Sequence, residues 1–68
     1  MEGRIVPDDR IGEICSELGL LIERLDDLAL EALREAVAEG ATARPEIERR
    51  IVRARNALER ARHLLGAD

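Results

Sequence analysis

The sequence predicts an all-α protein built as an antiparallel helical hairpin, and three observations indicate this class. The chain has 68 residues with no Phe, Trp or Tyr, so Leu, Ile, Val and Ala must form its core. Apolar residues recur at helical spacing in two segments, and one strong loop signal separates these segments. A chain this short folds as one domain at most. We expect helices over about residues 8–39 and 45–65, residues 1–7 as an N-terminal lead-in, and residues 8–68 as a single hairpin domain.

The first helix is predicted to start near residue 8. Pro7 suits the first helical turn, and the carboxylates of Asp8 and Asp9 favour the positive end of the helix dipole. Gly40 is well placed to end this helix in the left-handed conformation. Between these ends one broad apolar face is formed by Ile11, Ile14, Cys15, Leu18, Leu21, Ile22, Leu25, Leu28, Ala29, Ala32 and Ala36.

The loop signal is the segment from residue 40 to residue 45, where Pro45 biases Arg44 away from helical geometry. The second helix should begin between Thr42 and Pro45 and stop at Gly66. Its apolar residues follow the 4-3-4-3-4 spacing of a coiled-coil seam that faces another helix. The seam positions are Ile47, Ile51, Ala54, Leu58, Ala61 and Leu65.

The two predicted helices differ in length, at about 48 Å and about 32 Å for a rise of 1.5 Å per residue. A lone hairpin would therefore leave the start of the longer helix uncovered. One explanation is a second protomer, which predicts a dimeric four-helix bundle. The other is a break at Gly19 that folds residues 8–18 back as a third helix, because glycine costs about 1 kcal/mol relative to alanine within a helix. We favour the unbroken helix, since the apolar spacing continues through Gly19 in phase. The uncovered residues are Ile11, Ile14, Cys15 and Leu18.

Three further apolar residues lie outside the main stripe of the first helix. On a helical wheel Leu30 and Val37 lie near the back of that helix, and Leu33 lies on its flank. A simple hairpin would leave all three residues exposed. We therefore take these three residues as candidates for binding a protein partner, and we expect a homo-oligomer of two or four chains.

Catalytic and metal-binding chemistry is sparse in this chain. Cys15 is the only cysteine and His63 the only histidine, and we interpret them as a core residue and a solvated helix end. Glu59 and His63 are four positions apart, whereas di-iron helical bundles use a Glu-x-x-His spacing on two helices. We therefore expect no enzyme activity, catalytic residue, metal or cofactor. The single cysteine and the lack of a long apolar run favour a cytoplasmic protein without a membrane segment.

Charge divides the chain into two parts of opposite sign. Residues 1–40 contain four Arg and eleven acidic residues, and residues 41–68 contain seven Arg and four acidic residues. We expect Arg55 and Arg62, which flank the seam, to form ion pairs with carboxylates of the first helix. A second set follows the same spacing on the outer side of the second helix, where it could lie along phosphates. This outward ridge, the anion or nucleic-acid candidate, comprises Arg49, Arg53, Asn56, Arg60 and His63.

The alternation of Leu58 and Leu65 with Ala54 and Ala61 is similar to the core layers of the Rop family, plasmid RNA-binding regulators built as small dimeric helical hairpins. The resemblance is one of architecture and transfers no site residue, but it implies that a module this small is able to act on RNA. We expect a small non-enzymatic interaction module that self-associates and docks on a protein partner as a regulatory or assembly subunit. The alternative is a Rop-like regulator that binds RNA or DNA through the outward ridge.

Overall fold

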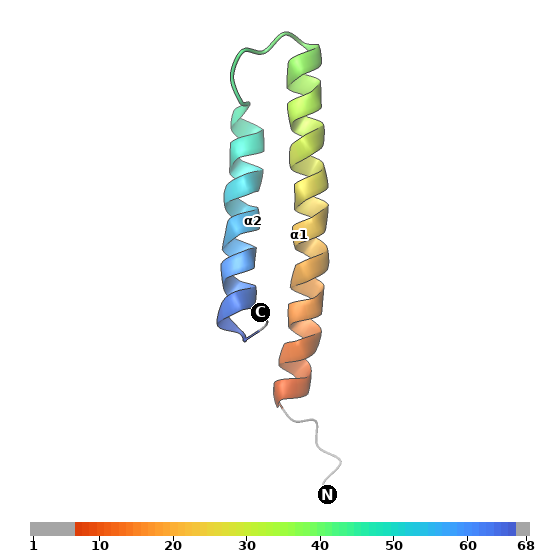
Figure 1. The fold of residues 1–68 in the computed structure, drawn as a ribbon, viewed down its shortest axis with the longest axis vertical. Helices are drawn as coiled ribbons and strands as arrows, with labels where there is room; N and C mark the ends of the chain where they lie inside the picture. The colour runs from red at the N-terminus through yellow and green to blue at the C-terminus, as the bar shows by residue number, and fades with distance from the viewer. Residues whose placement is uncertain (1–6, 67–68) are drawn as a thin grey trace, which may run out of the picture.

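The protein folds as two antiparallel α-helices that lie side by side (Figure 1). Helix α1 spans Pro7–Ala38 and helix α2 spans Glu46–Leu64, and residues 39–45 connect them. The computed structural model describes residues 7–66, so residues 1–6 of the predicted lead-in lie outside it. The predicted all-α hairpin is confirmed, and each helix end differs from its expected position by one residue.

Both helices end at glycines in the left-handed conformation. Gly40 has φ 85°, its N–H donates to the carbonyl oxygen of Val37 at 3.0 Å, and the N–H of Ala41 donates to Ala36 at 2.9 Å. These two bonds form a Schellman motif, which satisfies carbonyls that a helix end otherwise leaves unpaired. Gly66 has φ 100° and donates to His63 at 3.0 Å. The two predicted helix stops are confirmed.

Helix α1 continues without a break through Gly19. The three-helix alternative is therefore wrong. Glycine keeps the backbone N–H and C=O that the helix needs, and its cost of about 1 kcal/mol is small beside the packing of a long amphipathic face.

The core between the helices is thin. Its buried apolar residues are Cys15, Ile22 and Ala29 of α1, spaced by one heptad, and Ile51 of α2. No large side chain among residues 9–66 is fully buried. A small chain of this kind gains little free energy from burial beyond the conformational entropy that it loses, so further burial by association would stabilise it.

The part of α1 that α2 leaves uncovered is shorter than predicted. Helix α2 is shifted along α1 toward the N-terminal end of α1. The Nε of Arg62 donates to the carbonyl oxygen of Cys15 at 3.2 Å, so the last turn of α2 reaches that level. Cys15 is buried and Ile11 and Leu18 are half-buried, so the expectation that a lone hairpin leaves these three residues uncovered is wrong, whereas Ile14 is exposed as expected. At the other end the connection runs back along α1 before α2 begins (Figure 1). Its residues 41–45 line a hollow with Leu33, Ala36 and Val37.

Candidate interaction surfaces

Helix α2 does not turn the whole of its predicted seam toward α1. Ile51 is buried and Leu58 and Ala61 are half-buried, but Ile47 and Ala54 are exposed. The side of α2 that faces α1 instead includes Glu48, which is buried, and Arg55 and Arg62, which are half-buried. One edge of the predicted seam is therefore not covered by α1, because α2 is rotated so that this edge points to the side of the hairpin.

Helix α1 exposes apolar residues on that same side. Ile14, Leu21 and Leu28 recur at seven-residue spacing, and Leu28 lines one shallow groove together with Ile47 and Ile51 of α2. The large members of this surface are between 38% and 47% exposed, far more than core residues would be. We define the open apolar face as Ile14, Leu21, Leu28, Ile47, Ala54 and Leu65.

The other side of the hairpin is closed by polar contacts. Gly19 and Asp26 lie five positions after Ile14 and Leu21, which is about 140° around the helix. The Nε of Arg55 donates to Oδ1 of Asp26 at 3.0 Å. The predicted ion pair to α1 is confirmed for Arg55. Arg62 forms no such pair with any carboxylate among residues 9–66, and its Nε donates instead to the backbone carbonyl oxygen of Cys15.

Glu48 is a buried carboxylate on this closed side, and it was not predicted from the sequence as a core or site residue. Its side chain is 5% exposed, and its Oε1 accepts a hydrogen bond from Nε of Arg44 at 2.7 Å. That hydrogen bond, together with the charge of Glu48, raises the pKa of Arg44 above its ordinary value. The spacing of four residues between the two is the sequence signal that indicates such a pair.

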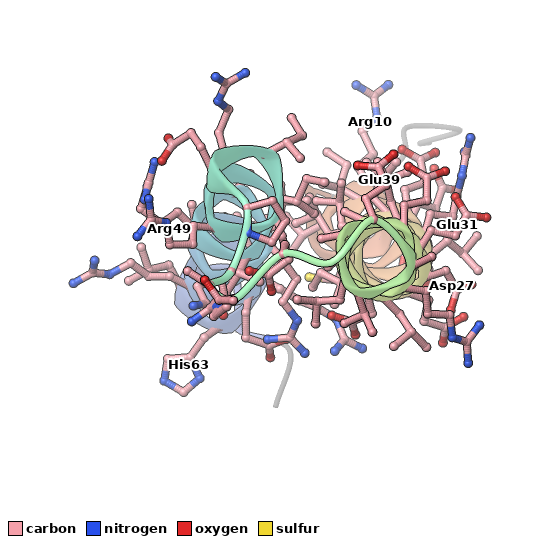
Figure 2. All side chains as sticks on the ribbon, turned by 90° about the horizontal axis from the view of Figure 1, so that it is seen from above. Arg10, Asp27, Glu31, Glu39, Arg49 and His63 are labelled. Atoms are coloured by element: carbon pink, nitrogen blue, oxygen red, sulfur yellow. The ribbon has the colours of Figure 1, made fainter. Side chains whose placement is uncertain are left out.

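The outward ridge lies on the solvent side of α2 as predicted from its spacing. All five of its side chains are exposed, and Arg49 and His63 project away from α1 (Figure 2). An acidic residue lies at its start, however. Oε1 of Glu46 accepts a hydrogen bond from Arg49 at 3.0 Å, and Oε2 lies 3.5 Å from Arg53. Two of the three ridge arginines therefore share one counter-charge.

The same pairing changes the titration of Glu46. The hydrogen bond from Arg49, followed by the charge of Arg49 and a smaller effect of Arg53, holds the pKa of Glu46 below its ordinary value. Glu46 continues the ridge spacing one turn ahead of Arg49, and this is the signal from which its role could have been predicted. Further along, Asn56 accepts a hydrogen bond from Arg55 at 3.4 Å.

The predicted partner-binding residues lie on the flank of α1 away from the open apolar face. Leu30 is 46% exposed and Val37 is 72% exposed, whereas Leu33 is half-buried. Leu33 and Val37 line the hollow under the connection, next to Ala43 and Pro45. The structure thus brings two of the three residues into one shallow apolar site, with Leu30 one turn away, and we call this site together with Leu30 the docking patch.

The remaining chemical groups form no shared site. Cys15 is buried between the helices, and His63 projects into solvent from the outer side of α2 (Figure 2). Within residues 7–66, no group of three or more His, Cys, Asp or Glu side chains is placed to hold a metal ion. Neither of the two described helices is both long and apolar enough to cross a bilayer.

Comparisons with known proteins give no relative. No protein-family model, no curated protein and no solved structure matches the chain.

Proposed function

We propose that this protein is a small non-enzymatic interaction module that self-associates through its open apolar face and presents the docking patch to a protein partner. The observation that carries this proposal is the rotation of α2. The rotation closes one side of the hairpin with polar contacts and leaves apolar residues of both helices exposed on the other side. A four-helix bundle requires this arrangement, because each of its helices must bury a stripe directed between two neighbours.

The thin core supports the same conclusion. The apolar residues buried between the helices are few, and the half-exposed leucines of the open apolar face would complete a second layer of core in a pair of hairpins. Exposed apolar patches of this kind mark association sites in soluble proteins. Two copies would form a dimeric four-helix bundle with a common interior.

The docking patch remains on the outer side of such a bundle, since Leu30 and Val37 lie away from the open apolar face. Residues 1–40, the part of the chain that includes Leu30, Leu33 and Val37, contain four Arg and eleven acidic residues. We therefore propose that the partner presents an apolar surface bordered by basic side chains, and that the module acts as a regulatory or assembly subunit. The pairing of Glu46 with Arg49 and Arg53 argues against the alternative of a nucleic-acid regulator.

Self-association is tested by light scattering and sedimentation over a range of concentrations. The wild type should have at least twice the chain mass. The double variant Leu21→Ser/Leu28→Ser should be monomeric, because both residues lie on the open apolar face. Leu20→Ser is the matched control, since Leu20 is 62% exposed yet lies outside that face. A wild type that stays monomeric at high micromolar concentration would refute the proposal.

Partner docking needs a separate measurement. Proteins captured from the native host by the wild type should be compared with those captured by Leu30→Ser/Val37→Ser. A partner that binds the docking patch should be lost from this variant and retained by Leu20→Ser. Identical captures by all three proteins would contradict the assignment of the patch.

A further inference from the structure

We propose that two copies pair through α1 as an antiparallel dimer in one register, in which Glu17 of each subunit faces Arg24 of the partner subunit. This proposal rests on the self-association proposed above and specifies its geometry.

A line of charges that alternate in sign borders the open apolar face on α1. Arg10, Glu17, Arg24 and Glu31 are spaced by seven residues, and all four are exposed. Arg24 and Glu31 line the same shallow groove as Leu21, Leu25 and Leu28. Among the side chains of residues 9–66, Glu17, Arg24 and Glu31 form no ion pair. These charges are therefore available to a second helix that packs on the leucines.

The charges select one register for two α1 helices that pack against each other. Residues that flank the core of a coiled coil pair between helices and set their alignment and orientation. In an antiparallel pair, placing Glu17 opposite Arg24 of the partner subunit also places Arg10 opposite Glu31 of the partner subunit. Twofold symmetry then gives four attractive pairs. Sliding the helices by one heptad in one direction sets Glu17 against Glu31, and in the other direction it sets Arg10 against Arg24, so both alternatives oppose like charges.

The apolar residues of α1 fit the same register. It brings Leu18 opposite Leu21 of the partner subunit and Ile14 opposite Leu25 of the partner subunit. Ile11 then lies opposite Leu28 of the partner subunit. By symmetry each pair occurs twice, so each layer along the contact of the two α1 helices is apolar. The half-exposed Ile14, Leu21 and Leu28 become buried in these layers.

Helix α2 provides an independent check on this register. The twofold axis lies level with the peptide bond between Gly19 and Leu20 of α1. Inside the hairpin, Arg62 contacts Cys15 and Arg55 contacts Asp26, so the level of the axis corresponds to about residues 59 and 60 of α2.

An axis at that level also aligns the seam of one α2 with the seam of its symmetry copy. Leu58 then lies opposite Ala61 of the partner subunit, and Leu65 lies opposite Ala54 of the partner subunit. Each layer therefore combines a large with a small residue, which fills a core without overpacking. The apolar layers of α1 and the residue sizes of α2 thus agree with one axis, and the charged pairs of α1 are centred within one residue of it.

Charge reversal tests the register. Arg24→Glu places a carboxylate against Glu17 of the partner subunit at two symmetric positions, and it should weaken the dimer by about tenfold or more. Glu17→Arg should do the same, and the double variant Glu17→Arg/Arg24→Glu should recover most of the affinity, because the reversed charges again face each other. Arg34→Glu is the matched control, since Arg34 is exposed and lies outside the line of Arg10, Glu17, Arg24 and Glu31. Sedimentation at low ionic strength gives the dissociation constants.

The outcomes separate this proposal from the preceding one. A dimer in which Arg24→Glu weakens association no more than Arg34→Glu, or in which the double variant does not recover, refutes the register and leaves self-association intact. A monomeric wild type refutes self-association itself. A second measurement uses exposed cysteines in a Cys15→Ala background. A short bis-maleimide should crosslink a mixture of Glu17→Cys and Arg24→Cys chains more efficiently than either chain alone, and equal crosslinking in all three samples would overturn the register.

Discussion

The guanidinium of Arg62 lies directly over Gly19. A Cβ built on Gly19 would have three guanidinium atoms of Arg62, among them Nε and Cζ, at 3.6 Å. The same Nε donates to the carbonyl oxygen of Cys15, one turn before Gly19. An arginine from the end of α2 thus rests on bare backbone of α1, at the level where the proposed dimer axis passes.

This contact predicts the effect of Gly19→Ala. At 3.6 Å a methyl group makes an ordinary van der Waals contact with the guanidinium, so the substitution should be accommodated. Alanine should then stabilise α1 by about 0.5–1 kcal/mol, because it loses less backbone entropy than glycine in a helix. Urea unfolding at a fixed protein concentration measures the change. Gly12→Ala is the matched control, since a Cβ there meets nothing within 4 Å. If Gly12→Ala stabilises and Gly19→Ala destabilises, Arg62 requires the bare backbone.

The pair of Glu46 with Arg49 predicts a dependence of stability on pH. The pKa of Glu46 is lowered in the folded protein from its ordinary value of 4.5. Its ionised form therefore stabilises the fold above that pH, and this contribution is lost as the pH falls through the folded pKa. The wild type should unfold at a higher temperature than Glu46→Gln at neutral pH, and the difference should shrink in acid. Glu39→Gln controls for the loss of one exposed carboxylate, and a difference that does not change with pH would contradict the assignment.

The outward ridge can be tested for nucleic-acid binding directly. Because Glu46 neutralises part of the ridge, we expect the wild type to bind generic RNA and DNA no more tightly than about 10 μM at about 150 mM salt. The variant Arg49→Gln/Arg53→Gln/Arg60→Gln should fold normally, since all three side chains are exposed. Nanomolar binding by the wild type that is abolished in this variant would establish the nucleic-acid alternative, and fluorescence anisotropy against a salt series measures both proteins.

Much of the fold could be predicted from local sequence features. The positions of Gly40 and Gly66 predicted the helix ends, because a left-handed residue is strained for any side chain that carries a Cβ. The continuous apolar spacing through Gly19 predicted an unbroken α1. The ridge positions were also predicted correctly as exposed, since residues spaced by three and four share one side of a helix.

The interaction surfaces were predicted only in part. The exposed Leu30 and Val37 follow from the helical wheel, but the hollow that joins Val37 to Leu33 depends on the path of the connection. Glu46 and Glu48 follow from short spacings to Arg49 and Arg44, although these spacings alone do not show that Glu48 is buried. The contact of Arg62 with Cys15 joins residues 47 positions apart, and no local pattern predicts it.

The sequence by itself determined where the helices begin and end and which residues share a side of each helix, because both depend on neighbours within one or two turns. Only the tertiary structure decided how far α2 is shifted along α1 and how it is rotated. The shift and the rotation depend on how the side chains of two separate helices fit together, and several arrangements bury comparable apolar area. The contact of Arg62 at Gly19 and the pair of Arg55 with Asp26 occur only in the arrangement observed, which leaves Ile47 and Ala54 on the open apolar face.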